Sequence, residues 1–248
     1  MSSSWNPSAG ASPSAGAPPV DLSVYLITDT AQCAARGRSV AETVAHAVAG
    51  GVTAVQVREK AADGGDFLRT VLEVAAVLPE PVALMVNDRV DVFLAARAAG
   101  ARVTGVHVGQ SDLPVAAVRE LIGEAAVLGL STATPEEVRA AAGEPARVDH
   151  LGIGALRATR TKTDAPPALG HDGFARLVRL GPLPAVAIGG VTPADLPRLR
   201  TAGAAGAAVV SGVCAAEDPR SAAAAYAQAW RNTTPVGPKE CRGDTDTR

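Results

Sequence analysis

Eight short runs of apolar, often β-branched residues are spread along this chain, and each is followed by a stretch with the periodicity of an amphipathic helix. An alternation of this kind predicts a parallel sheet whose strands are connected by helices. Eight repeats within about 210 residues match a (β/α)₈ TIM barrel, an α/β fold in which a parallel eight-stranded barrel is surrounded by helices. The expected strands are residues 24–28, 54–58, 83–87, 105–108, 127–131, 150–154, 185–189 and 206–212.

Helix boundaries agree with this alternation. Thr134-Pro135 and Thr192-Pro193 each place a capping residue before a proline of the first helical turn. Gly100 and Gly203 follow helical stretches, where glycine commonly ends a helix. A doubly wound open sheet is the alternative fold. It is less favoured because no run reads as an edge strand and no G-x-G-x-x-G follows the first run.

The ends of the chain differ in composition from the part between them. Residues 1–20 are rich in Ser, Pro, Ala and Gly and lack the basic and apolar regions of a secretory signal, so a disordered tail is expected. Residues 232–248 are polar, and a second disordered tail is expected there. No composition break divides residues 21–231, which are expected to form one catalytic barrel domain.

The overall charge gives no reason to expect a polyanionic partner. With a net charge of −2, the chain is expected to bind neither nucleic acid nor a membrane surface, and no apolar stretch reaches the ~18–20 residues that span a bilayer. The three cysteines are far apart and odd in number, so reduced thiols in a cytoplasmic protein are expected. Self-association into a homo-oligomer stays open, because no interface can be derived from the sequence.

Polar residues gather where the expected strands end, which is where TIM barrels place their active sites. Gln56, Arg58 and Lys60 alternate at the end of the second strand and therefore share one face. An amide and two cations on one face suit an anion such as a diphosphate. A solvated, charged start of the following loop is the alternative, and this motif alone does not decide between them.

Two carboxylates lie at the ends of the next two strands. Asp88 follows Asn87 after the third strand, and Asp112 lies shortly after the fourth. Mg²⁺ typically takes one or two carboxylates together with phosphate oxygens of a substrate, so this pair is a candidate magnesium site. The alternative is that each aspartate caps the following helix, which Pro114 after Asp112 would also fit.

The remaining strand ends suggest a second anion site. Small residues that let backbone N–H groups reach a phosphate follow the seventh and eighth strands. A long loop after the sixth strand contains hydroxyls and cations, and loops of this length in compact barrels are usually functional. The residues are Gly189, Gly190, Val210 and Ser211 at the strand ends and Thr159, Arg160, Thr161 and Lys162 in the loop. None of the four histidines is assigned chemistry; His107, between two valines, is interpreted as a core residue.

Together these segments resemble the thiamine-phosphate synthase family. The similar segments, in order, are YLITD (25–29), VQVREK (55–60), the stretch from 86 to 114, GLST (129–132), LGIGALRATRTK (151–162), AIGGVTPADL (187–196) and VVSGV (209–213). The joint pattern is specific, whereas no single motif is. The resemblance implies a Mg²⁺-dependent transferase that joins hydroxymethylpyrimidine diphosphate to hydroxyethylthiazole phosphate, giving thiamine monophosphate and diphosphate by a dissociative mechanism.

The resemblance also implies roles for individual residues. Asp88 and Asp112 would bind Mg²⁺. The catalytic residues would be Arg58, Ser131 and Lys162. The pyrimidine diphosphate would be held by Gln56, Val57, Arg58, Glu59, Lys60, Asn87, Ser131 and Lys162, and the thiazole phosphate by Thr159, Arg160, Thr161, Gly189, Gly190, Val210 and Ser211.

The chain departs from the family pattern at three places. Ser111 stands where a glutamate is usual, Ala155-Leu156-Arg157 replaces proline, an apolar residue and an aromatic, and Ala133 stands where a histidine is common. A related thiazole tautomerase uses a histidine after the serine of the fifth strand, and Thr132 and Ala133 do not supply one. A non-catalytic barrel that binds thiamine precursors stays open as a function, as does a Schiff-base aldolase acting through Lys162.

Overall fold

Eight parallel strands close into a barrel in the order in which they occur along the chain, as seen in a computed structural model. β8 returns to pair with β1, with Leu26 opposite Val209. The expected TIM-barrel fold is confirmed, and most strand bounds lie within a residue or two of those expected. The strands are β1 Val24–Ile27, β2 Ala54–Val57, β3 Ala83–Asn87, β4 Gly105–Val108, β5 Val127–Thr132, β6 His150–Gly154, β7 Ala185–Ile188 and β8 Gly206–Val209.

The structure describes residues 20–143, 147–158 and 168–233. Almost all of the two expected tails lies outside these ranges, so the expected domain limits stay a prediction. None of the helices within the described ranges combines the length and the apolar character that crossing a bilayer requires.

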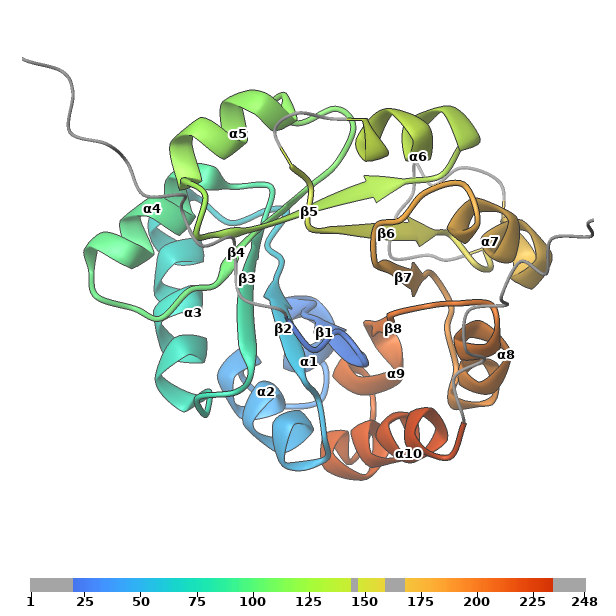
Figure 1. Cartoon of the computed structure of the whole chain (residues 1–248). Helices are drawn as coiled ribbons and strands as arrows, with labels where there is room; N and C mark the ends of the chain where they lie inside the picture. Colours follow the sequence, from blue (N-terminus) through green and yellow to red (C-terminus); the bar gives the residue numbers. More distant parts are fainter. Residues whose placement is uncertain (1–19, 144–146, 159–167, 234–248) are drawn as a thin grey trace, which may run out of the picture.

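Helices form the outer layer and surround the strands, which occupy the centre of the view (Figure 1). Two short helices, α1 and α9, are additions to the expected pattern and lie directly after β1 and β8. The helices are α1 Thr30–Ala34, α2 Val40–Ala49, α3 Gly64–Val77, α4 Val90–Ala98, α5 Val115–Ile122, α6 Pro135–Ala142, α7 Gly170–Val178, the 3₁₀ helix η1 Pro193–Asp195, α8 Leu196–Thr201, α9 Ser211–Cys214 and α10 Pro219–Arg231.

The helix signals in the sequence correspond to real caps. The Thr134 side chain accepts the N–H of Glu137 at the start of α6, and the Glu137 side chain accepts the N–H of Thr134 in return. At η1 the Asp195 side chain accepts the N–H of Thr192 in the same way. Each cap satisfies backbone N–H groups that a helix start leaves without an intrahelical partner, and so fixes where the loops after β5 and β7 end.

Alternation along each strand divides the apolar side chains into two cores. In β1, Val24 and Leu26 belong to the large core between barrel and helices, whereas Tyr25 and Ile27 belong to a smaller core inside the barrel. Successive side chains of a strand point to opposite faces, which produces this division. The inner core fills the interior of the barrel. Side chains at the C-terminal strand ends therefore lie above a filled interior.

Candidate active site

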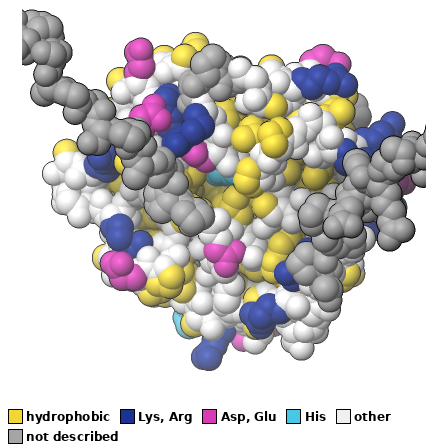
Figure 2. Space-filling view, viewed as in Figure 1, with side chains coloured by type: hydrophobic (Ala, Val, Ile, Leu, Met, Phe, Trp, Pro, Cys, Tyr) yellow, Lys and Arg dark blue, Asp and Glu magenta, His cyan; other side chains and the backbone are white. Residues whose placement is uncertain are grey.

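A cavity of about 1000 Å³ opens at the C-terminal ends of the strands. Eleven of the residues that the sequence singled out line it: Gln56, Arg58, Lys60, Asn87, Asp88, Asp112, Ser131, Gly189, Gly190, Val210 and Ser211. They come from β2, β3, β5 and the segments after β2, β3, β4, β7 and β8, so only closure of the barrel brings them together. On the face shown in Figure 2, apolar side chains gather near the centre, and many acidic and basic side chains lie further out.

The end of β3 presents a carboxylate that neighbouring side chains hold in place. Lys60 Nζ lies 2.6 Å from Asp88 Oδ2, and the Asn87 side chain donates to Asp88 Oδ1 at 2.8 Å. Asp88 has a φ of 60°, a left-handed conformation that Asp and Asn tolerate better than most residues. The amide of Asp88 also donates to the His107 carbonyl at 2.8 Å. A cation and an amide thus orient this carboxylate at the cavity wall.

Asp112 faces the same cavity from the loop after β4. Its Oδ2 accepts the N–H of Gly109 at 2.7 Å. Burial, together with the nearby Asp88 carboxylate, holds the pKa of the Asp112 carboxyl above its ordinary value. The two carboxylates are therefore close enough for their charges to interact, which is the electrostatic situation that a bound cation relieves.

The alternative interpretation, that these aspartates cap helices, is wrong. The N-cap residue of α4 is Arg89 and that of α5 is Pro114, and neither helix start has a side-chain cap. Asp88 and Asp112 both line the cavity, and neither side chain is used to cap a helix.

The donor set suits a hard cation that needs few protein ligands. In the part of the chain that the structure describes, no group of three or more His, Cys, Asp or Glu side chains is placed to hold a metal. Two carboxylates satisfy Mg²⁺, which keeps several waters and uses phosphate oxygens of a substrate. Asp88 and Asp112 are thus the side chains that would hold it.

Residues 56–60, at the end of β2 and directly after it, lie partly at the cavity wall and partly in the outer core. Gln56, Arg58 and Lys60 all line the cavity, as strand alternation predicts. The Gln56 amide donates to the Tyr25 hydroxyl at 2.8 Å, so Gln56 forms part of a fixed floor. Val57 is fully buried in the outer core, and Glu59 accepts a hydrogen bond from Thr30. The Val57 side chain therefore cannot contact a molecule in the cavity, and only its backbone could.

A histidine pair that the sequence did not mark as functional lies below Ser131. His107 Nε2 lies 3.0 Å from the Ser131 hydroxyl, and His107 Nδ1 lies 3.3 Å from His150 Nε2. Both imidazoles are buried. The sequence contained an indication that His107 faces the barrel interior. His107 stands between two valines that face the outer core, and successive side chains of a strand point to opposite faces. Gly129 lies in register beside His107 and leaves room for the imidazole ring. His150 lies in register beside Gly129 and is the hydrogen-bond partner of His107.

Acidification is expected to destabilise the fold through His150. Burial, and then the charge of His107, lowers the pKa of His150 to about 3. An unfolded histidine titrates near 6.5, so between these values the unfolded chain binds a proton that the folded chain does not. Stability is therefore lost as the pH falls below 6.5, by about 2 kcal/mol between pH 7 and pH 5. Urea unfolding at both pH values measures this loss.

His150→Gln and His46→Gln provide the comparison for that measurement. His150→Gln removes the buried titrating group and is expected to flatten the dependence between pH 7 and pH 5. His46 is exposed on α2, and its replacement is expected to leave the dependence as in wild type. An equal loss of stability in wild type and His150→Gln would contradict this assignment.

The opposite wall is made mainly of backbone. Gly189 and Gly190 have φ values of 93° and 65°, which glycine adopts without a steric cost. Val210 and Ser211 follow β8 and lead into the short helix α9. This is the arrangement of the phosphate site that recurs after strands 7 and 8 of TIM barrels. Thr159, Arg160, Thr161 and Lys162 lie outside the described residues, so their expected roles stay predictions.

Comparison with known proteins agrees with this geometry. The family described as thiamine monophosphate synthase matches residues 24–213. A thiamine-phosphate synthase of Azorhizobium caulinodans is 46% identical over 206 residues, covering 83% of this chain and 93% of that protein. That of Albidiferax ferrireducens is 45% identical over 203 residues, covering 82% of this chain and 89% of the relative.

Solved structures agree as well. A thiamine phosphate pyrophosphorylase from Pyrococcus furiosus superimposes with a TM-score of 0.73 at 32% identity, covering 85% of this chain and 96% of that one. An orotidine 5'-phosphate decarboxylase from Pyrococcus horikoshii, at 15% identity and a TM-score of 0.59, shares only the fold. This chain therefore belongs to the thiamine monophosphate synthase family, whose members are transferase enzymes.

Proposed function

We propose that this enzyme is a Mg²⁺-dependent thiamine-phosphate synthase that joins hydroxymethylpyrimidine diphosphate to hydroxyethylthiazole phosphate. One observation carries the proposal: a single cavity has a wall of cations and carboxylates on the β2–β4 side and a glycine-rich backbone wall on the β7–β8 side. A reaction between a diphosphate ester and a phosphate monoester needs two such anion sites. A volume of about 1000 Å³ is at the upper end of ordinary ligand pockets and leaves room for both substrates.

The diphosphate belongs at the β2–β4 wall. Arg58 and Lys60 supply positive charge, and a guanidinium can donate two parallel hydrogen bonds to a phosphate. The ion pair between Lys60 and Asp88 brings one of these cations beside the carboxylates. When bound there by Asp88 and Asp112, Mg²⁺ would neutralise the negative charge that builds up on the departing diphosphate.

The bond changes require little covalent work from the protein. The carbon–oxygen bond between the pyrimidine methylene and the diphosphate breaks first, and the diphosphate leaves with the electron pair. The nitrogen of the thiazole then attacks the cationic methylene, which forms the carbon–nitrogen bond of thiamine monophosphate. The chain's task is to stabilise the leaving anion and to hold the nucleophile within reach of the carbon.

Ser131 and the floor position the pyrimidine in this proposal. The Ser131 hydroxyl lies at hydrogen-bond distance from the buried His107, which limits its rotation. The Gln56 amide is held by Tyr25 in the same way. Polar groups fixed beforehand cost little reorganisation when the substrate binds. The predicted contributions of Lys162 to the diphosphate, and of Thr159, Arg160 and Thr161 to the thiazole phosphate, complete the proposed site.

The test is a coupling assay with the purified protein. The two substrates are mixed with the protein and Mg²⁺, and thiamine phosphate is detected by mass. We expect product with Mg²⁺, a loss of turnover of at least about 10²-fold with excess EDTA, and recovery when Mg²⁺ is restored. Turnover that is unaffected by EDTA would contradict the proposed metal dependence.

Competing functions give different results in the same assay. Saturable binding of either precursor by folded protein without turnover would identify a non-catalytic binding barrel. Isomerisation of a thiazole carboxylate phosphate without coupling would identify a tautomerase, although the Ala133 methyl at the cavity wall offers no base. Action in the cytoplasm and self-association stay predictions.

A further inference from the structure

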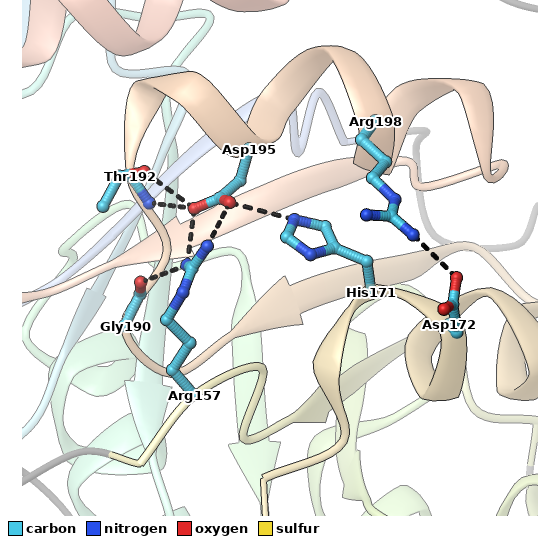
Figure 3. Close-up of polar contacts among 7 residues, drawn as sticks. All are labelled: Arg157, His171, Asp172, Gly190, Thr192, Asp195 and Arg198. Carbon is cyan, nitrogen blue, oxygen red and sulfur yellow. Dashed lines mark hydrogen bonds and ion pairs between the residues drawn. The ribbon is translucent and has the colours of Figure 1, made fainter.

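Arg157 lies just after β6 and bonds to the turn that follows β7. Its Nη1 donates to the Gly190 carbonyl at 2.9 Å and to Asp195 Oδ2 at 2.6 Å, and its Nη2 donates to Asp195 Oδ1 (Figure 3). The backbone N–H of Arg157 donates to the Gly189 carbonyl at 3.0 Å. One residue thus contacts both glycines of the backbone wall and the 3₁₀ helix behind them.

Asp195 anchors this arrangement from the other side. Its carboxylate is buried and accepts two more hydrogen bonds at 2.8 Å, from the N–H and the hydroxyl of Thr192. His171 Nε2, from α7, lies 2.9 Å from Asp195 Oδ1. Burial alone would raise the pKa of Asp195, but the hydrogen bonds from Arg157 and Thr192 hold it well below its usual range. The carboxylate therefore stays ionised and paired with Arg157.

The turn between β7 and η1 is where such an anchor matters. Gly189 and Gly190 both have positive φ, and glycine has more backbone freedom than any other residue. A Cβ at Gly190 would lie 3.1 Å from Arg157 Cβ, so Arg157 packs closely over this glycine. Both glycines line the cavity, whereas Arg157 is not among the described residues that do. Its influence on a bound molecule is therefore exerted through the glycines.

We propose that Arg157 is a positioning residue for the phosphate monoester. By holding the Gly190 carbonyl and Asp195 at once, it keeps the Gly189–Gly190 backbone at the cavity wall in the conformation that receives the phosphate. The role rests on the proposed function for the identity of the substrate. Because Asp195 balances the charge of Arg157, the effect comes from the geometry of the turn rather than from direct attraction of the anion.

The experiment compares Arg157→Ala, Arg157→Lys and Arg198→Ala in steady-state assays. Arg157→Ala is expected to raise the KM for the thiazole phosphate about tenfold, the size expected if the displaced glycine turn loses one hydrogen bond to the charged phosphate. The KM for the pyrimidine diphosphate and kcat are expected to change less than about twofold. Arg157→Lys keeps the charge but not the two parallel bonds, and is expected to recover part of the loss.

Arg198→Ala is the matched control. Arg198 lies on α8 in the same view, and its Nη2 is 2.7 Å from Asp172 Oδ1 (Figure 3). Both side chains of this pair are largely exposed, so its loss is expected to leave all three kinetic constants unchanged. Equal changes in both KM values in Arg157→Ala, or an unchanged KM for the thiazole phosphate with only a lower melting temperature, would overturn the positioning role.

Two further readouts separate this proposal from the proposed function. Hydroxyethylthiazole phosphate is titrated alone into wild type and Arg157→Ala by calorimetry, and amide hydrogen exchange is followed at residues 189–192. Weaker binding and faster exchange in Arg157→Ala support the role even if the wild type yields no thiamine phosphate. Normal turnover with unchanged KM, or unchanged exchange at these residues, overturns the role while leaving the proposed function intact.

Discussion

Replacing Asp88 with asparagine is expected to lower kcat/KM for coupling by about 10³-fold. The substitution removes a negative charge that the proposed Mg²⁺ site depends on, and a contribution of about 4 kcal/mol corresponds to that factor. Asparagine is the informative replacement because Asp88 has a φ of 60°. Asparagine tolerates this conformation, whereas alanine would add backbone strain. The measurements are steady-state rates at several Mg²⁺ concentrations, with a weakened apparent Mg²⁺ affinity expected.

Asp91→Asn is the control for this prediction. Asp91 lies three residues further along the chain, in the first turn of α4, and its carboxylate is paired with Arg89 on the surface. Its replacement is expected to change kcat/KM by less than about twofold. If Asp88→Asn retained the rate and the Mg²⁺ dependence of the wild type, the carboxylate at the end of β3 would not be a metal ligand.

Gly129→Ala is expected to lower the free energy of unfolding by about 2–3 kcal/mol and to impair coupling as well. A Cβ at Gly129 would lie 2.3 Å from His107 Nδ1 and 2.5 Å from His150 Nε2. Both imidazoles are buried and cannot swing into solvent. Room for the methyl group therefore requires the histidine pair to separate, which also displaces the hydrogen-bond partner of Ser131. Urea unfolding and kcat/KM measured on the same preparation test both effects.

Gly143→Ala is the control, because it adds the same methyl group at a glycine where no atom lies close enough to clash. Gly143 follows α6 with a φ of −94°, and the nearest atom to an added Cβ would be 3.7 Å away. A change in stability within about 0.5 kcal/mol is expected. Equal stabilities and rates for Gly129→Ala and Gly143→Ala would mean that the histidine layer yields easily and does not constrain Ser131.

Local patterns were sufficient for the barrel because its elements repeat. Each strand is a short run with buried faces on both sides, and each helix has a periodic apolar stripe, so the alternation could be read without knowing any contact. The helix starts at Thr134 and Thr192 were equally local, since a cap involves residues three apart. The short helices α1 and α9 were not expected, because four or five residues carry too little periodicity.

The candidate site was predicted as a set of strand ends. Arg58, Asp88, Ser131 and Gly190 are far apart in sequence, but parallel strands in a closed barrel bring their C-terminal ends to one rim. The residues that support the site were missed. Tyr25 below Gln56 and His150 below His107 are buried partners from other strands. Strand alternation indicates which side chains face the barrel interior, but only the register between strands shows which of them meet.

By itself, the sequence determined the fold class, the order of the elements and the rim on which the site is found, because these follow from periodicity and chain direction. Only the tertiary structure decided what each polar side chain does. The structure shows that Asp88 and Asp112 do not cap helices and that the Val57 side chain lies in the core. It also shows that Arg157 bonds to Asp195, 38 residues away in the sequence. Hydrogen bonds and charge pairs act over a few ångströms in space, and only folding sets which distant residues come that close.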